Sequence, residues 1–266
     1  MSLPRPHPAA RAVVTGASSG IGAALAEGLA ARGHALILVA RRVDRMEELA
    51  GRLRRDRAVE VEVRGCDLAD VRDRRALCGE LADRTISVLC NNAGFATFGG
   101  FSALDAARER EEVEVNVVAV HELTAAVLPG MVARGSGAVL VTGSTAGHQP
   151  MPGAATYSAS KAFVNTFAEA LHAELRGTGV TCTLLAPGPV RTGFTAVADV
   201  PEFERRAPGF VWVSAEQAAG QALTAMERGR RRAVPGAFAV AGTVGGRYTP
   251  RAVLLPVLTK VIGALT

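Results

Sequence analysis

Short apolar runs alternate with longer amphipathic stretches along this 266-residue chain. Six runs are almost continuously apolar, as expected of strands that are covered on both faces. They are Ala12–Thr15, Ala35–Ala40, Val59–Val63, Ser87–Cys90, Ala138–Thr142 and Val180–Leu185. Between them lie helix-length segments rich in Ala, Leu, Arg and Glu, for example Gly22–Arg32 and Ala155–Arg176. This alternation predicts βα units that build one parallel sheet.

The pattern continues without a linker or a shift in composition, which predicts a single α/β domain over residues 11–266 with a doubly wound parallel sheet. Residues 1–10 are proline-rich and are expected to form a flexible leader. Residues 188–213 mix proline, glycine and aromatics without periodicity, which is typical of a lid or a substrate loop. The pattern assigns no role to the apolar segment at about 240–266.

Composition narrows the class of protein. With 48% hydrophobic and 21% charged residues, the chain is neither disordered nor fibrous. The four cysteines form no CxxC pair, so we expect reduced core thiols and a cytoplasmic location. No stretch reaches 18 uninterrupted apolar residues, and no transmembrane segment is expected. The histidines lack metal-ligand spacing such as HExxH, so no metal site is expected either.

The basic excess is made almost entirely of arginine. Net charge is +5, and all but two of the 30 basic residues are arginines. An excess of positive charge favours the binding of an anionic ligand. A nucleic-acid or membrane surface is the rival interpretation, because arginines cluster at 52–57, 72–75 and 228–232. Acidic residues interrupt or border these runs and no nucleic-acid-binding motif accompanies them, which favours solvated helix faces.

A glycine-rich turn follows the first predicted strand and leads directly into a helix. Glycines allow a tight turn and close approach to a phosphate, and the helix N-terminus offers free N–H groups to a pyrophosphate. An ordinary βα turn would look the same if nothing else accompanied it. The expected dinucleotide contacts are Gly16, Ser18, Ser19, Gly20, Ile21 and Gly22.

The end of the second predicted strand reads Ala40-Arg41-Arg42. Enzymes that use NAD place an acid there to bind the ribose 2′-hydroxyl, whereas two guanidiniums can bind the 2′-phosphate of NADP. Asp44 is the nearest acid, but it lies beyond the strand end, where we expect it to cap the next helix. The alternative is that both arginines are only surface charge. We therefore expect NADP(H) as the cofactor.

Tyr157 and Lys161 lie four residues apart, so they share one face of a helix. A phenol ordinarily titrates near pH 10, too high for efficient proton exchange at neutral pH. A nearby ammonium favours the phenolate, so we expect Lys161 to lower the pKa of Tyr157. The pair predicts acid–base chemistry.

Taken in order, these features resemble the short-chain dehydrogenase/reductase family over about residues 10–235. The glycine spacing from Thr15 to Gly22 matches its TGxxxGxG motif, and Tyr157 to Lys161 matches its YxxxK motif. Further matches are Cys66-Asp67-Leu68, Asn91-Asn92-Ala93-Gly94, Asn116, Ser144 and Pro187-Gly188. The resemblance implies a Rossmann fold, a nicotinamide cofactor and hydride transfer to or from a carbonyl or alcohol carbon.

The resemblance also implies roles for single residues. Tyr157 would exchange the proton, Lys161 would also bind the nicotinamide ribose, Ser144 would bind the substrate oxygen and Asn116 would hold a water. The expected adenosine contacts are Asp67, Leu68, Asn92, Ala93 and Gly94, and those near the nicotinamide are Pro187, Gly188, Val190 and Thr192. Family members associate through the long helices after the fourth and fifth strands, so a homodimer or homotetramer is expected.

The substrate pocket is expected where three segments follow strands at the catalytic edge of the sheet. Their side chains are mostly apolar, which predicts a hydrophobic carbonyl or alcohol substrate. The candidate contacts are Phe95, Phe98, Thr145, Met151, Phe194 and Trp212, with Phe203 and Phe210 as further aromatics. The alternative function is a catalytically silent NADPH-binding sensor or scaffold, which the presence of Ser144, Tyr157 and Lys161 disfavours.

Overall fold

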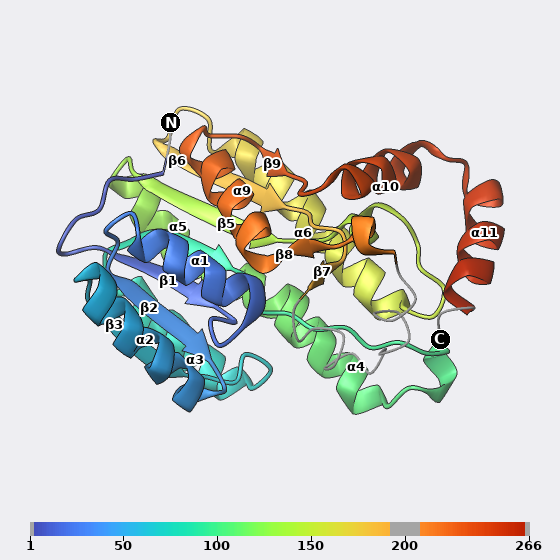
Figure 1. Ribbon diagram of the computed structural model, residues 1–266. Coiled ribbons are helices and arrows are strands. Elements are labelled where there is room, and N and C mark those ends of the chain that lie inside the picture. Colours follow the sequence, from blue (N-terminus) through green and yellow to red (C-terminus); the bar gives the residue numbers. More distant parts are fainter. Residues whose placement is uncertain (1–2, 192–207, 264–266) are drawn as a thin grey trace.

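A computed structural model describes residues 3–191 and 208–263. Its centre is a seven-stranded parallel sheet with the strand order β3-β2-β1-β4-β5-β6-β9 (Figure 1). The chain moves outward from β1 to β3 and then crosses back to place β4 beside β1, so the strand order reverses between these two strands. Ligands of doubly wound sheets bind at this reversal, outside the carboxyl ends of the strands. The strands are β1 (Arg11–Thr15), β2 (Leu36–Ala40), β3 (Val61–Gly65), β4 (Ile86–Asn91), β5 (Gly137–Thr142), β6 (Val180–Leu185) and β9 (Arg232–Ala233).

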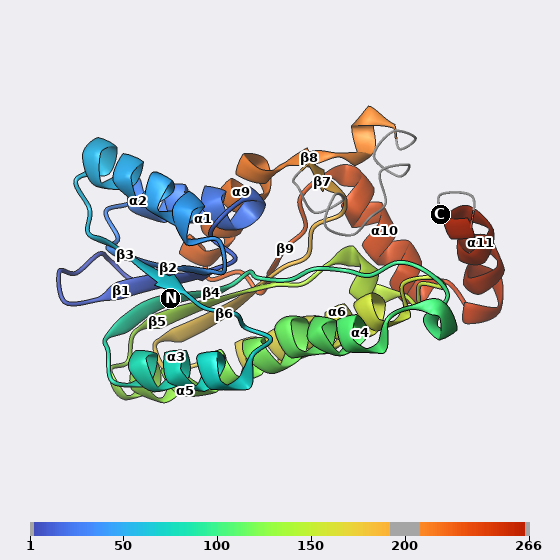
Figure 2. The ribbon, with the colours of Figure 1, turned by 90° about the horizontal axis from the view of Figure 1, so that it is seen from below.

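Helices cover both faces of the sheet (Figure 2). One layer contains α1 (Gly20–Ala30), α2 (Val43–Arg57) and α9 (Ala215–Glu227). The other contains α3 (Val71–Ala82), α4 (Ala106–Val113), the π-helical turn η2 (Glu114–Val118), α5 (Ala119–Ala133) and α6 (Ala155–Glu174). Neighbouring strand residues serve opposite layers: Val14 joins the core under α1, and Val13 joins the core under α5. The predicted single doubly wound α/β domain is confirmed.

Most predicted elements are present with ends that differ by one or two residues. The strand predicted from Val59 begins at Val61, and the helix predicted from Gly22 begins at Gly20. Three strands were not predicted: β9, and the pair β7 (Val190–Arg191) and β8 (Val213–Ser214) inside the predicted loop. Each spans two residues, too short to produce a periodic pattern.

The apolar segment after residue 236 folds as two helices, α10 (Ala237–Tyr248) and α11 (Arg251–Gly263). Both lie beyond the carboxyl ends of the strands, and α11 stands apart from the sheet (Figure 1). Val244 and Val253 are among their exposed apolar side chains, with exposed fractions of 53% and 59%. These helices therefore extend the domain on the side where a ligand would enter.

One helical run among the described residues, Ala106–Ala133, is long and apolar enough to cross a membrane by length and composition alone. In the fold it is α4, η2 and α5, and Leu123 and Val127 pack into the core against the sheet. A core helix passes the same test, so this run is weak evidence for a membrane span.

The cysteines form no disulfide in the structure, and two arginines of the basic runs pair with acidic residues. All four cysteines are free, and Cys66, Cys90 and Cys182 are buried as expected of core thiols, whereas Cys78 is half-buried. Arg74 is 1% exposed and donates to Glu114 at 2.9 Å and to Glu122 at 2.7 Å. Arg52 pairs with Glu27 across α1 and α2 at 3.0 Å. Part of the basic excess is thus neutralised within the helical layers.

Candidate active site

The turn between β1 and α1 requires glycine for two different reasons. Gly16 has φ +67°, and a Cβ added there would lie 2.9 Å from the Cα of Ala93. A Cβ on Gly22 would lie 2.2 Å from the carbonyl oxygen of Gly16, so helix α1 could not pack on the turn. At the N-cap of α1, Ser19 makes no side-chain capping bond. The first N–H groups of the helix are therefore available to an anion.

Thr15 ties this turn to the end of β4. Its hydroxyl accepts from the backbone N–H groups of Asn92 at 2.9 Å and Ala93 at 3.0 Å, and it donates to the carbonyl of Cys90. The Asn92 side chain donates back to the Thr15 carbonyl at 3.0 Å. These bonds hold the two strand ends at the reversal of the sheet, where the adenosine half of a dinucleotide is expected.

Two arginines stand at the end of β2, as predicted. The guanidinium of Arg42 donates to the hydroxyl of Ser18 at 2.8 Å and to that of Ser19 at 2.7 Å, so it is held over the glycine turn. Arg41 lies 3.9 Å from a carboxylate oxygen of Asp67. Asp44 lies in the first turn of α2, whose N-cap is Arg42, so the expected capping role of Asp44 is wrong.

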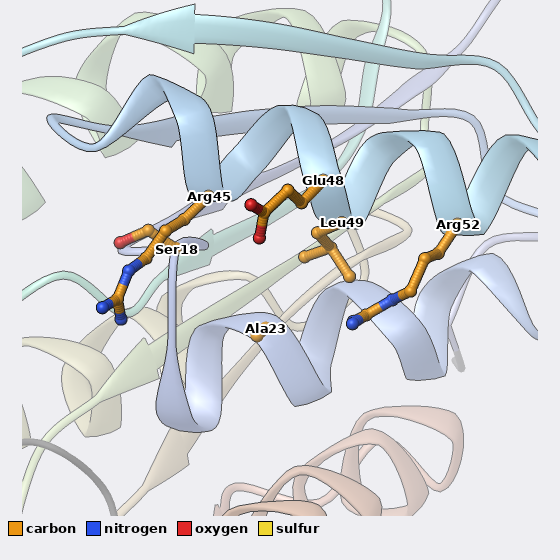
Figure 3. A pocket seen from close by; sticks show the side chains of 6 residues that line it. All are labelled: Ser18, Ala23, Arg45, Glu48, Leu49 and Arg52. Carbon is orange, nitrogen blue, oxygen red and sulfur yellow. The ribbon is translucent and has the colours of Figure 1, made fainter.

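A third arginine reinforces this positive end of the site. Figure 3 shows Arg45 beside Ser18, and Glu48 between Arg45 and Arg52 along α2. These residues line a groove between α1 and α2 with a volume of about 430 Å³. Burial lowers the pKa of Arg42, and the nearby charges of Arg45 and Arg41 lower it further. Like charges accumulate in this way where an anion can bind between them.

The predicted catalytic side chains come together at the carboxyl end of β5 and the start of α6. Lys161 is 4% exposed, and its ammonium donates to the carbonyl of Thr142 at 2.9 Å. It lies 5.8 Å from the ring centroid of Tyr157. Ser144 hydrogen-bonds with the Tyr157 side chain. A hydroxyl, a phenol and an ammonium therefore share one site, as their order in the sequence predicted.

Asn165 holds Ser144 in place, and the sequence interpretation did not include it. The Asn165 amide donates to the Ser144 carbonyl at 2.9 Å and accepts from the Ser144 backbone N–H at 3.3 Å. Asn165 is four residues after Lys161 on α6. Tyr157, Lys161 and Asn165 thus recur every four residues on one helix face, a signal that could have revealed it.

The pKa shift of Tyr157 has the opposite sign to the one predicted from its spacing with Lys161. Enclosure of the phenol raises the pKa of Tyr157 to about 12; the hydrogen bond with Ser144 opposes this shift, and the charge of Glu112 adds to it. Burial also lowers the pKa of Lys161 to about 8. The expectation that Lys161 lowers the Tyr157 pKa overall is therefore wrong for this structure, because desolvation outweighs the hydrogen bond with Ser144 and the charge of Glu112 acts in the same direction as desolvation.

Asn116 lies in the π-helical turn η2, 1% exposed. Its side chain accepts from the backbone N–H of Phe95 at 3.1 Å and donates to the Phe95 carbonyl at 2.8 Å and to the hydroxyl of Ser160 at 3.1 Å. A Cβ on Gly94 would lie 2.8 Å from the Asn116 oxygen. Asn116 thus ties the segment after β4 to α6, and single π-turns are frequent at functional sites.

One cavity of about 750 Å³ joins the glycine turn to Tyr157. Most of the predicted cofactor and substrate residues line it: Gly16, Ser18, Ser19, Gly20, Ile21, Arg41, Arg42, Asp67, Leu68, Asn92, Ala93, Gly94, Phe95, Phe98, Ser144, Thr145, Met151, Tyr157, Lys161, Pro187, Gly188, Val190 and Trp212. Gly22 and Asn116 stand behind the wall rather than in it. No group of metal-ligating side chains occurs in the described part of the chain.

The cavity also differs from the prediction in several residues. Phe210 is 78% exposed and does not line it. Thr192, Phe194 and Phe203 lie outside the described residues. Among the lining residues that were not predicted are Glu111 of α4, Val115 of η2, Gln149, and Phe238 and Leu258 from α10 and α11. The last two explain the apolar C-terminal segment in part, since it closes one side of the cavity.

Comparisons with known proteins agree with this geometry. The short chain dehydrogenase family profile matches residues 10–201. Sulfoacetaldehyde reductase 2 of Chromohalobacter salexigens is 39% identical over 189 residues, 70% of this chain and 74% of that protein. A short-chain dehydrogenase from Sphingobium yanoikuyae, solved in complex with NADPH, shares 32% identity and has a TM-score of 0.81 over 96% of this chain and 95% of that one.

A bulky-bulky ketone specific alcohol dehydrogenase from Comamonas testosteroni shares 29% identity, with a TM-score of 0.77 over 96% of this chain and 94% of that one. The glycine turn fits the nicotinamide dinucleotide that this family uses, because the turn lines the cavity and the first N–H groups of α1 have no side-chain cap. The chain therefore belongs to the short-chain dehydrogenase/reductase family and is an oxidoreductase that acts on alcohol or carbonyl groups.

Proposed function

We propose that the chain is an NADP(H)-dependent enzyme that interconverts the carbonyl and secondary alcohol forms of a hydrophobic small molecule. The observation that carries this proposal is the single cavity that runs from the Arg41–Arg42 end of β2 to Tyr157. A sensor or scaffold would need the cofactor end of this cavity only, and the family relation does not favour it.

Each catalytic side chain has one task in this proposal. NADPH, when bound, supplies the hydride. Ser144 donates a hydrogen bond to the substrate oxygen, and Tyr157 donates the proton that the resulting alkoxide needs. The raised pKa of Tyr157 keeps the phenol protonated at neutral pH, which is the form that carbonyl reduction requires. Lys161 binds the nicotinamide ribose, and Asn116 holds Phe95 and α6 in register around the site.

Cofactor preference provides the first test. NADPH should bind at least about tenfold more tightly than NADH, because one charge-assisted contact to the 2′-phosphate contributes about 1.5 to 3 kcal/mol. Arg41→Ala and Arg42→Ala should each weaken NADPH binding about tenfold and leave NADH binding unchanged. Arg55→Ala, at an exposed position on α2, the helix that follows Arg42, is the matched control. Equal dissociation constants for the two cofactors, measured by nicotinamide fluorescence, would contradict the assignment.

The substrate class is inferred from the far end of the cavity. Phe95, Phe98, Met151, Phe238 and Leu258 are apolar lining residues there. Of the charged side chains in the described lining, the cations are Arg41 and Arg42 at the cofactor end and Lys161 beside Tyr157. None is left over for an anionic substrate group such as a sulfonate. The likeness to a dehydrogenase of bulky ketones supports the same choice.

A homologous series of aryl alkyl ketones tests the substrate class. The kcat/KM should rise with alkyl length, by roughly fourfold for each buried methylene, which corresponds to about 0.8 kcal/mol. Phe238→Ala should flatten this trend, whereas Phe101→Ala, an exposed phenylalanine that does not line the cavity, should not. Faster reduction of sulfoacetaldehyde than of every ketone in the series would reject a hydrophobic substrate and leave the family assignment intact.

Assembly and location belong to the proposal as well. Phe163 is 45% exposed and stacks on Phe167 with ring centroids 6.0 Å apart on α6. His121 of α5 lies 5.8 Å from the same Phe167 ring. The exposed rings of His121 on α5 and Phe163 on α6, both packed on the half-buried Phe167, support a homo-oligomer joined through the two helices. The four free cysteines support a reducing, cytoplasmic compartment.

A further inference from the structure

Two carboxyl groups are buried behind the active site. Glu112 is 0% exposed and Glu109 is 7% exposed. They lie three residues apart on α4 and so project from the same face of that helix. Carboxylates are rarely buried without a cation. Neither carboxyl forms an ion pair among the described residues. Another interaction must therefore offset the cost of burying the two groups.

The hydroxyl of Thr97 bridges these two carboxyls. It contacts Glu112 Oε2 at 2.7 Å and also contacts Glu109 Oε1, while the Thr97 backbone N–H donates to Glu112 Oε2 at 2.9 Å. A threonine hydroxyl carries one proton, so it can donate to only one of the two carboxyls. The other contact needs a proton on the carboxyl itself. The geometry thus fits one proton shared within the pair.

The cluster reaches the catalytic groups from two sides. Glu112 Oε1 accepts from the side-chain amide of Asn116 at 3.4 Å. Glu109 contacts the hydroxyl of Thr156, the residue immediately before Tyr157. The charge of Glu112 also acts on Lys161 and Tyr157, raising the pKa of both. Two elements of the site, η2 and the start of α6, therefore rest on this carboxyl pair.

We propose that Glu112 is a positioning residue of the active site: it orients Asn116 through their hydrogen bond and supplies a buried negative charge to the site that Asn116, Tyr157 and Lys161 form. This inference rests on the proposed roles of Tyr157, Asn116 and Lys161. Thr97, whose hydroxyl contacts both carboxyls, links Glu109 to Glu112.

The sign of the pH dependence follows from the groups that face Glu112. These are Glu109 on its own helix and Tyr157 and Lys161 on α6. Burial and the charge of Glu109 raise the pKa of Glu112 to about 7, against hydrogen bonds from Thr97 and the charge of Lys161 that lower it. Above that pH the carboxylate supports the Lys161 ammonium, whose pKa is about 8. Activity on the alkaline side should therefore depend on Glu112.

Glu112→Gln tests this directly, because glutamine is isosteric and its oxygen can still accept from Thr97. With NADPH and acetophenone, the alkaline limb of the kcat profile should move to lower pH by about one unit, with little change in the KM for the ketone. Glu112→Asp, which keeps the charge, should move the limb back toward the wild-type position. Glu174→Gln, an exposed carboxylate on α6, is the matched control. An unmoved limb in Glu112→Gln would overturn the proposal.

A second readout does not depend on turnover. A carboxyl that titrates near 7 when folded and near 4.3 when unfolded makes the wild type lose stability as pH rises between those values. The Tm of Glu112→Gln minus that of wild type should increase from pH 4.5 to pH 7.5, whereas Glu174→Gln should show no such trend. A constant difference would contradict the buried shared proton, whether or not Tyr157 is the proton donor.

Discussion

Replacement of Tyr157 by phenylalanine should lower kcat by about 10²- to 10⁴-fold, the contribution typical of a positioned general acid. The substitution removes one oxygen atom from a half-buried ring and leaves Phe98, whose ring centroid is 6.5 Å away, in place. NADPH affinity should stay within about twofold, because the lost group acts on the substrate oxygen. Absorbance of NADPH reports turnover, and its fluorescence reports binding.

The second tyrosine of the chain provides the control. Tyr248 lies on α10 and is 74% exposed, so Tyr248→Phe should leave both measurements unchanged. Retained turnover in Tyr157→Phe would remove the proton donor from the mechanism. Loss of NADPH binding in the same variant would show instead that the ring supports the cofactor end of the cavity.

The sheet could be predicted because its central strands are buried on both faces. Such strands are continuous apolar runs in the sequence. Val13 and Val14 illustrate this: both are fully buried, yet they face opposite helical layers. The edge strand β9 carries no such signal. Its two residues are a strand only because they pair with Leu184 and Leu185 of β6, a contact between segments almost 50 positions apart.

The residues of the active site also fall into those that the sequence could predict and those that it could not. Gly16, Tyr157 and Lys161 could be predicted because their chemistry depends on local spacing in one turn and one helix. Phe238 and Leu258 could not be, because they reach the cavity only after α10 and α11 fold over it. The spacing of Tyr157 and Lys161 in the sequence does not show how far either side chain is removed from solvent. For this reason the net shift of the Tyr157 pKa was predicted with the wrong sign.

Glu112 shows most clearly that the sequence alone does not reveal which residues are buried. In the sequence it is one of several acids in a charged stretch, typical of a solvated helix face. The fold turns that position inward, where Thr97 from the segment after β4 meets it. A buried acid can be recognised only when the segments that enclose it are known, and periodicity on α4 alone does not specify them.

Removal of the Lys161 ammonium should damage catalysis and cofactor binding together. Lys161→Met keeps most of the buried aliphatic volume but deletes the charge and the donor to the Thr142 carbonyl. We expect kcat to fall by about 10²- to 10⁴-fold. NADPH should bind at least about tenfold more weakly, because a charged hydrogen bond to the ribose is lost.

This double loss distinguishes Lys161 from Tyr157, whose replacement should affect kcat alone. The other lysine, Lys260 on α11, is exposed, and Lys260→Met controls for the general effect of losing one positive charge from the chain. If Lys161→Met binds NADPH as tightly as wild type and loses only turnover, then Lys161 acts on the proton and not on the ribose. A Tm close to that of wild type would confirm that the loss arises in the site, since methionine fills the space of the lysine stem and removes the desolvated ammonium.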